Sequence, residues 1–270
     1  MRFIVDDSAF TIESLDGESQ ARSWFADDAF AMLSQWWTLA SWQRRYSYQF
    51  RWLGRPIIQL PADVMMMQEL IWRTRPDVII ETGIAHGGSV VLHASILKLV
   101  HECSHVQPAP ECCEGSKSRP RVIAIDIEIR PENLAALKAH PLQPFYTLLE
   151  GSSIEATTAE RVRQMLRADD RVMVVLDSNH TRDHVLTELH AYAPIVSPGS
   201  ALVVMDGIMA DLAHVPGGSR EWERDHPGRA IAEFMVTPLG RQFAIDHSFD
   251  SYALTHSPGG VLVRRDGAGE

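Results

Sequence analysis

The stretch ETGIAHGGS, residues 81–89, directly follows the apolar run PDVII. Gly83, Gly87 and Gly88 allow the chain to turn tightly and let its backbone closely approach a ligand or a neighbouring element. An apolar run that ends in Glu81 and a glycine turn is typical of a buried strand leading into a helix. Backbone N–H groups at such a helix start can hold a carboxylate. A nucleotide-like ligand is one explanation of the turn, and plain strand-to-helix packing is the other.

Strand-like and helix-like segments alternate along most of the chain around this turn. This alternation predicts an α/β fold with a doubly wound, mostly parallel sheet. The predicted strands are 78–80, 121–127, 145–151, 171–177 and 200–206, with closing segments at 243–249 and 261–265, and the predicted helices are 62–74, 88–100, 131–139, 158–166, 182–193 and 227–236.

Each of the five main predicted strands delivers polar or acidic residues to one edge of the sheet. Ligands bind beyond the carboxyl ends of parallel strands, so these residues are candidates for a binding site. Asp126, which ends the second strand, is placed to accept hydrogen bonds from ribose hydroxyls. With a glycine turn that lacks the GxGxxG and P-loop patterns, it fits a nucleoside carrying an amino-acid tail, namely S-adenosylmethionine. The strand-end residues include Glu81, Asp126, Glu128, Glu150, Gly151, Ser152, Ser153, Asp177, His180 and Asp206.

Asp177 and Asp206 end two strands that are consecutive along the chain. Two carboxylates there can hold a hard cation such as Mg²⁺ through oxygen ligands. His180, three residues after Asp177, is a candidate general base, because a histidine pKa lies near the working pH. It would remove the proton of a metal-bound hydroxyl, whose oxygen would attack the sulfonium methyl group. The alternative is that the aspartates cap turns and His180 is an ordinary loop histidine.

The motifs that carry a resemblance to a known family are WLGRPIIQLP (52–61), QELIWRTRPDVIIETGIAHGGSVVLHASIL (68–97), LDSNH (176–180), VVMD (203–206) and SPGGVLVRR (257–265). In these motifs the chain resembles the cephalosporin hydroxylase family, whose members look like class I S-adenosylmethionine-dependent O-methyltransferases. It is also similar to macrolide-sugar O-methyltransferases, which use magnesium. The resemblance runs from about Tyr46 to Arg265, and ETGIAHGGS and LDSNH are its most specific parts.

The resemblance implies a Rossmann-like class I methyltransferase fold and positions for its ligands. The segment from Glu81 through Ser89 would bind the methionine part of the cofactor, Asp126 the ribose, and Ser152 and Ser153 would lie near the adenine. The implied cofactor-binding residues are Glu81, Gly83, His86, Gly87, Ser89, Asp126, Ser152, Ser153 and Asp177, the implied metal ligands are Asp177 and Asp206, and the implied base is His180.

Three features qualify this picture. Related enzymes usually carry Glu-Asp where this chain has Met205 and Asp206, so one carboxylate near the metal is lost. Residues 101–120 form a polar insertion, unlike the family, that we expect to be a surface loop, and its cysteines and histidines also offer zinc ligands. Residues 207–226 are expected to form either a lid over the substrate or a passive loop.

The N-terminal part, residues 1–56, differs from the rest of the chain by its aromatic content. Five of the seven tryptophans lie in it, and the apolar residues between 25 and 37 follow a helical spacing. We expect residues 1–20 to be loosely ordered. The remainder should form a helical cap that packs on the main domain or on a partner subunit, or a wall that faces the substrate. Residues 57–270 would form the catalytic domain, and the cap predicts a homo-oligomer.

Composition limits the possible functions. A net charge of −10 repels phosphate backbones, which disfavours general nucleic-acid binding. No apolar stretch is long enough to span a bilayer, and MRFIVDDSAF lacks the pattern of a signal peptide, so we expect a cytoplasmic location. Three cysteines in one polar stretch do not indicate a disulfide framework.

Three functions therefore compete. The first is a magnesium-assisted O-methyltransferase acting on a hydroxyl of a small natural product or sugar moiety. The second is an iron-dependent hydroxylase, for which His180, Asp183 and His184 offer two histidines and a carboxylate. The third is a non-catalytic cofactor-binding protein that assists an oxygenase. The sequence identifies neither the acceptor nor the position that is methylated.

Overall fold

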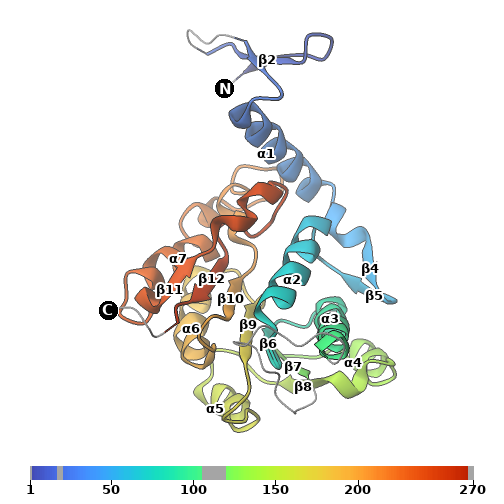
Figure 1. Cartoon of the computed structure of the whole chain (residues 1–270). Coiled ribbons are helices and arrows are strands. Elements are labelled where there is room, and N and C mark those ends of the chain that lie inside the picture. The colour runs from blue at the N-terminus through green and yellow to red at the C-terminus, as the bar shows by residue number, and fades with distance from the viewer. Residues whose placement is uncertain (1, 17–20, 105–119, 267–270) are drawn as a thin grey trace.

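The computed structural model describes residues 2–16, 21–104 and 120–266. Its main strands are β6 (Val78–Thr82), β7 (Arg121–Asp126), β8 (Tyr146–Glu150), β9 (Val172–Leu176), β10 (Ala201–Val204), β11 (Phe243–Ile245) and β12 (Val261–Arg264). They form one sheet in the order β11-β12-β10-β9-β6-β7-β8 (Figure 1). β10, β9, β6, β7 and β8 pair in parallel, whereas β12 is antiparallel to β10 and β11. The predicted doubly wound, mostly parallel fold is confirmed.

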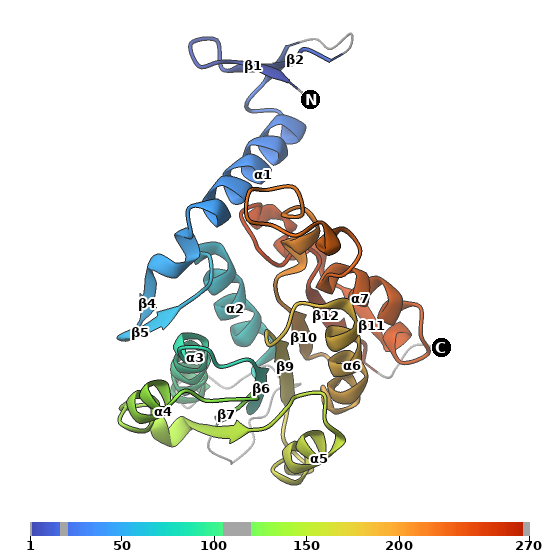
Figure 2. The same cartoon turned by 180° about the vertical axis from the view of Figure 1, so that it is seen from behind.

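Six helices cover the two faces of this sheet (Figure 2). Side chains of β6 alternate between the faces: Ile79 packs with the helices of one face and Ile80 with those of the other. Burial on both faces explains why the central strands read as continuous apolar runs. α2 (Pro61–Thr74), α3 (Gly88–Ser104) and α4 (Pro131–Lys138) cover one face, and α5 (Ala156–Gln164), α6 (Arg182–Tyr192) and α7 (Pro227–Met235) cover the other.

The strand order reverses direction beside β6. β7 and β8 lie on one side of β6, and β9 and β10 lie on the other. The loops that leave β6 and β9 therefore lead to helices on opposite faces of the sheet, and open α/β sheets bind ligands at this point of the carboxyl edge. Every strand-end residue predicted above leaves the sheet at this edge.

The N-terminal part differs from the expectation. Residues 3–14 were expected to be loosely ordered, but β1 (Phe3–Asp6) and β2 (Thr11–Ser14) pair in an antiparallel hairpin, to which β3 (Arg22–Ser23) adds. Asp6 Oδ1 accepts the Ser8 and Ala9 N–H groups and so closes the turn. The expectation rested on the polar residues of this stretch, but one of them, Asp6, builds the turn.

The N-terminal helix α1 (Asp27–Gln43) extends away from the sheet (Figure 1). Its aromatic stripe does not pack on the main body: Phe25 just before it is 79% exposed and Phe30 is 55% exposed. The residues that α1 buries are small or polar, Ala29, Ser34, Thr38 and Ser41. Phe25 and Phe30 therefore do not cover the catalytic domain.

A hairpin formed by β4 (Phe50–Trp52) and β5 (Arg55–Ile57) connects α1 to the main body. It packs on α3, where the Trp52 indole N–H donates to Ser95 Oγ at 3.0 Å. α3 itself continues to Ser104, four residues beyond its predicted end, because the helical pattern runs into the polar insertion. His105, Cys112 and Cys113, which were considered as zinc ligands, lie outside the described residues.

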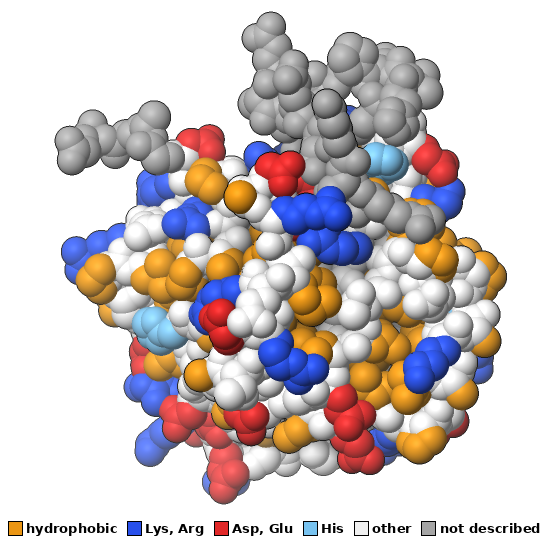
Figure 3. All heavy atoms as spheres, turned by 90° about the horizontal axis from the view of Figure 1, so that it is seen from below, with side chains coloured by type: hydrophobic (Ala, Val, Ile, Leu, Met, Phe, Trp, Pro, Cys, Tyr) orange, Lys and Arg blue, Asp and Glu red, His pale blue; other side chains and the backbone are white. Residues whose placement is uncertain are grey.

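The described surface carries both signs of charge, as expected from the charged fraction of the sequence (Figure 3). On the face shown in Figure 3, basic and acidic side chains of the described residues are interspersed among apolar ones. Within the described ranges, no helix combines the length and apolar character needed to cross a membrane.

Candidate active site

The glycine turn after β6 passes directly against the loop after β9. Gly83 has φ +89°, and a Cβ atom there would lie 2.0 Å from the Asp177 carbonyl oxygen. No side chain fits in that space, so glycine is required by both contact and conformation. A Cβ atom on Gly88 would similarly lie 2.2 Å from the Pro56 carbonyl oxygen. The turn is thus enclosed between the β9 loop and strand β5.

Asp126 fixes the shape of this turn. Its Oδ2 atom accepts the Ile84 N–H at 2.8 Å and the Ala85 N–H at 3.3 Å. The carboxylate at the end of β7 and the turn after β6 were predicted as two parts of one binding site, and the structure places them in direct contact. One oxygen of Asp126 already serves the backbone, and the other accepts a weak hydrogen bond from Glu128 N–H at 3.3 Å.

Two residues that sequence reasoning missed hold the other side of the turn. The Arg55 guanidinium donates to the His86 carbonyl oxygen through Nε at 2.9 Å and to Asn133 Oδ1 at 2.8 Å. Asn133 in turn donates through Nδ2 to the Ala85 carbonyl oxygen at 2.8 Å. The only signal for Arg55 was its position in the WLGRPIIQLP motif.

Glu81 is fully buried, with both oxygens engaged. Ser89 Oγ donates to Oε1, and His93 Nδ1 lies 2.8 Å from Oε2. A buried carboxylate needs such partners, because burying it unpaired is costly. Glu81 therefore links the end of β6 to the first turns of α3. His93, which is also fully buried, was not identified from the sequence.

A small pocket or cavity lies above the turn. Residues from three separate parts of the chain meet around it: the segment after β5, the glycine turn and the β9 loop. It is lined by Pro56, Ile57, Ile58, Gln59, Gly83, Ile84, Ala85, His86, Gly88, Ser89 and Asp177. Several predicted cofactor-binding residues thus surround one space.

Ser153, at the end of β8, belongs to a different cluster. Its Oγ lies 3.1 Å from His184 Nε2, which also lies 3.1 Å from Ser178 Oγ. Ser178 donates to Glu188 Oε1 at 2.7 Å. Ser153 thus meets the β9 loop, while its neighbour Ser152 is half-buried. The two serines lie at the same edge of the sheet as the turn, and neither lines the cavity.

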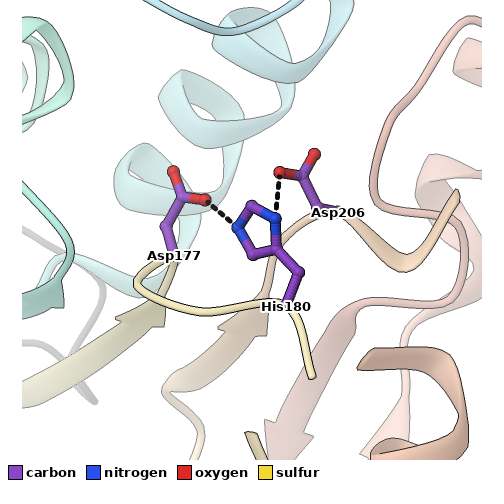
Figure 4. Close-up of side chains that lie close together, drawn as sticks. All are labelled: Asp177, His180 and Asp206. Carbon is purple, nitrogen blue, oxygen red and sulfur yellow. Dashed lines mark ion pairs between the residues drawn. The ribbon is translucent and has the colours of Figure 1, made fainter. Parts of the chain in front are cut away.

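Asp177, His180 and Asp206 meet at the carboxyl ends of β9 and β10. Figure 4 shows the imidazole of His180 between the two carboxylates. Its Nε2 is 3.5 Å from Asp177 Oδ1, and its Nδ1 is 3.2 Å from Asp206 Oδ2. Among the described residues these three form the group whose donor atoms lie close enough together to hold a metal ion. Carboxylate oxygens are suitable ligands for Mg²⁺.

The charges in this cluster shift one another's pKa values. Burial alone would lower the pKa of His180, but the negative charges of Asp206 and Asp177 outweigh it and raise that pKa to about 9. Burial raises the pKa values of Asp177 and Asp206, against the opposing effect of His180. An imidazole beside two carboxylates is stabilised in its protonated form, so without a cation in the cluster His180 holds a proton at neutral pH. A cation bound by the two aspartates would offset their charge and lower this pKa toward the range of a general base.

The model of the rhamnosyl O-methyltransferase/CmcI family matches residues 44–265. The chain belongs to this family. It is 25% identical to the rhamnosyl O-methyltransferase of Mycobacterium bovis over 209 residues, which cover 75% of this chain and 73% of that protein. For the enzyme of Mycobacterium leprae the identity is 25% over 221 residues, 79% of this chain and 82% of the relative.

Solved structures of CmcI are similar in fold. The apo form of CmcI N160 has a TM-score of 0.53 at 17% identity, over 81% of this chain and 77% of that chain. CmcI D160 with Mg and SAM has a TM-score of 0.51 at 16% identity, over 81% and 78%. The resemblance drawn from the sequence motifs is confirmed, as is the prediction of an O-methyltransferase.

In this member of the rhamnosyl O-methyltransferase/CmcI family, Met205 stands beside Asp206. Met205 is buried in the core, and its sulfur contacts Ser257 Oγ at 3.5 Å. Asp206 has φ 55°, a left-handed conformation that aspartate tolerates better than most residues. The Asp206 N–H donates to Ser257 Oγ at 3.3 Å, and His256 Nδ1 lies 3.8 Å from Asp206 Oδ1. The segment before β12 therefore supports this carboxylate.

Asp63 of α2 holds that segment in place and was not identified from the sequence. It is almost fully buried, and it accepts hydrogen bonds from Thr255 Oγ1 at 2.5 Å and from the His256 N–H at 3.1 Å. Burial outweighs these bonds and raises its pKa to about 7. Asp63 is thus a buried acid that connects α2 to the support of Asp206.

The raised pKa of Asp63 predicts a pH-dependent stability. The folded state binds this proton more tightly than the unfolded state, where the pKa is 3.8. Its contribution is therefore fully present below pH 3.8 and is lost as pH rises through 7. Between pH 5 and 8 we expect the free energy of unfolding to fall by about 3 kcal/mol more in the wild type than in Asp63→Asn.

Urea unfolding at several pH values measures this difference. Asp183→Asn is the control, because Asp183 is 83% exposed and should leave the wild-type pH dependence unchanged. Parallel curves for the wild type and Asp63→Asn would contradict the prediction.

The metal group considered for a hydroxylase is not assembled. The Asp183 carboxylate pairs with Arg182, whereas the His184 imidazole faces Ser153 and Ser178. Of the two histidines in that reading, only His180 joins the carboxylate cluster. The observed geometry thus favours the methyltransferase over the iron-dependent hydroxylase.

Proposed function

We propose that this protein transfers a methyl group from S-adenosylmethionine to a hydroxyl of a small natural product or sugar moiety, with assistance from Mg²⁺. One observation carries the proposal: Asp177 both lines the cavity above the glycine turn and lies beside His180. A methyl donor in the cavity would therefore adjoin a base and two carboxylates. Relatives are rhamnosyl O-methyltransferases, and the D160 form of CmcI was solved with Mg and SAM.

The residues around the turn fit S-adenosylmethionine. The close approach of Gly83 and Gly88 to neighbouring backbone leaves a side-chain-free turn whose N–H groups can face an amino-acid tail. We assign the methionine part to the turn from Glu81 to Ser89, where Glu81 acts by fixing Ser89. Asp126 would receive the ribose hydroxyls, and Ser152 and Ser153 would lie on the adenine side.

The paired carboxylates fit Mg²⁺. Asp177 and Asp206 are held on facing loops with His180 between them, and each presents carboxylate oxygens to the same small space. We propose that these two aspartates hold the metal. When bound, Mg²⁺ would lower the pKa of an acceptor hydroxyl.

Methyl transfer to a hydroxyl needs a base that accepts the hydroxyl proton and a leaving group, here the sulfur of the cofactor. His180 takes the proton of the acceptor hydroxyl, and the oxygen forms a bond to the methyl carbon as the carbon–sulfur bond breaks. The electron pair of that bond stays on sulfur, which gives S-adenosylhomocysteine and the methyl ether. The charges of Asp177 and Asp206 stabilise the imidazolium that results.

We further propose that residues 207–226 act as a lid and that the protein is a homo-oligomer. Trp222 of this segment packs edge-on against Trp42 of α1, with ring centroids 6.0 Å apart, so the lid and the N-terminal helix are in contact. The exposed Phe30 and Trp37 of α1 support a role for this helix in subunit contacts.

Calorimetric titration with S-adenosylmethionine tests the proposal. We expect the wild type to bind it, and Asp126→Asn to bind about 10–100-fold more weakly, because asparagine can still accept the Ile84 N–H but loses the charge that receives the ribose hydroxyls. Glu128→Gln is the control, since this exposed neighbour of Asp126 serves neither the turn nor the cavity.

The same protein is then tested for transfer of a tritiated methyl group to a panel of phenyl glycosides, rhamnoside included. Addition of MgCl₂ after chelation should restore the rate. Lack of cofactor binding in the wild type would overturn the proposal. Transfer that is indifferent to chelation would overturn the role of the metal alone.

A further inference from the structure

Gln59 is a buried side chain whose polar atoms have no partner. It is 4% exposed, and neither Nε2 nor Oε1 makes a hydrogen bond within the protein. Buried amides in native proteins are almost always hydrogen-bonded, because an unpaired amide loses its contacts with water and gains nothing in return. Two unpaired atoms on one such residue call for a partner from outside the chain.

Gln59 lines the cavity above the glycine turn. It lies between β5 and α2, on a segment that is held close to the turn. A Cβ atom on Gly88 would be 2.6 Å from Ile57 Cα, and Arg55 donates to the His86 carbonyl oxygen. The position of Gln59 is therefore set by the same contacts that shape the turn.

Two carboxylates near the turn, those of Glu81 and Asp126, already have hydrogen-bond partners within the chain. Both oxygens of Glu81 have partners within the chain, and Asp126 accepts N–H groups of the turn. Among the described residues that line the cavity there is no lysine or arginine. A carboxylate entering this cavity would have to be received by N–H donors rather than by an ion pair.

We infer that Gln59 binds the amino-acid end of S-adenosylmethionine. This inference rests on the proposed function, because it assigns a residue to that cofactor. An amide offers one donor group and one acceptor, so Nε2 can donate to the α-carboxylate while Oε1 accepts from the α-ammonium. A zwitterion satisfies both unpaired atoms at once. An isolated anion or cation would satisfy one and leave the other buried without a partner.

Two ligands separate this role from a structural one. S-adenosylhomocysteine contains the amino-acid end, and 5′-methylthioadenosine keeps the thioether and nucleoside but lacks that end. We expect Gln59→Met, which preserves the volume and removes the amide, to weaken binding of S-adenosylhomocysteine by about 10–100-fold in calorimetry. Binding of 5′-methylthioadenosine should stay within about twofold of the wild type, because the ligand does not reach the amide.

Gln68→Met is the matched control, since Gln68 lies on α2, is half-buried and does not line the cavity. It should affect neither ligand. Gln59→Glu keeps the shape of the side chain but replaces the N–H donor with a negative charge. We expect it to weaken the binding of S-adenosylhomocysteine at least as much as Gln59→Met does. Thermal unfolding of each variant shows whether it is folded.

The outcomes are distinct. Equal weakening of both ligands by Gln59→Met, or no weakening of either, would overturn the role of Gln59. Equal affinity of the wild type for the two ligands would also overturn the role of Gln59, because the amino-acid end would then add nothing to binding, but it would leave cofactor binding itself intact. A wild type that binds neither ligand would instead overturn the proposed function.

Discussion

Replacing His180 by alanine is expected to lower the rate of methyl transfer by about 10²–10⁴-fold, the usual contribution of a general base. His180 lies between Asp177 and Asp206, whose charges favour the imidazolium that forms after proton removal. Alanine removes the proton acceptor and leaves the cavity intact, because His180 does not line it. Single-turnover transfer of a tritiated methyl group to the phenyl glycoside measures the rate, and calorimetry measures cofactor affinity.

The control for this variant is His247→Ala. His247 is a largely exposed histidine that pairs with Asp250, outside the segment 207–226. Its loss should leave the rate within a few-fold of the wild type. An undiminished rate in His180→Ala would exclude His180 as the base. A rate loss accompanied by an equal loss of cofactor affinity would instead assign His180 to binding.

The sheet and its functional edge could be predicted because they depend on local patterns. Strands buried on both faces read as apolar runs, and Asp126, Asp177 and Asp206 each follow such a run directly. In a parallel sheet, these residues must reach the same edge. The placement of Asp177 and Asp206 at neighbouring strand ends therefore follows from strand order, whereas the position of His180 depends on the path of the loop after β9.

Residues that support the site were missed because their roles depend on contacts between distant parts of the chain. Asp63 and His256 are 193 residues apart in sequence, and Arg55 and Asn133 are 78 apart. Nothing near Asp63 in the sequence distinguishes it from an ordinary residue in the first turn of a helix. Gln59 shows the same limitation: its amide becomes informative only when burial leaves it without a partner.

For the N-terminal helix, the sequence predicted an aromatic face that packs on the main domain or on a partner subunit. Within the described chain, the residues that α1 buries are small or polar, serine and threonine among them. Ser34 and Thr38 satisfy their hydroxyls within the helix by donating to the carbonyl oxygens of Phe30 and Ser34. Their polarity therefore costs little on burial.

Substituting Gly83 by alanine is expected to have a large effect on stability. The new Cβ would lie 2.0 Å from the Asp177 carbonyl oxygen and 2.6 Å from the carbonyl carbon, so backbone would have to move. Left-handed strain adds about 1–2 kcal/mol for a non-glycine residue. We expect a total loss of more than about 4 kcal/mol in the free energy of unfolding, a size reached only by substitutions with a specific steric or burial cause.

Gly217→Ala separates the left-handed backbone strain from the clash with the Asp177 backbone. Gly217 has φ +87°, against +89° at Gly83, but a Cβ atom there would have nothing within 4 Å. Urea unfolding should therefore give only the strain of about 1–2 kcal/mol for Gly217→Ala. The difference between the two variants measures the contact between the turn and the β9 loop. Equal losses would mean that the two loops can separate without cost. In that case the cavity that joins the turn to Asp177 would not be a fixed feature of the fold.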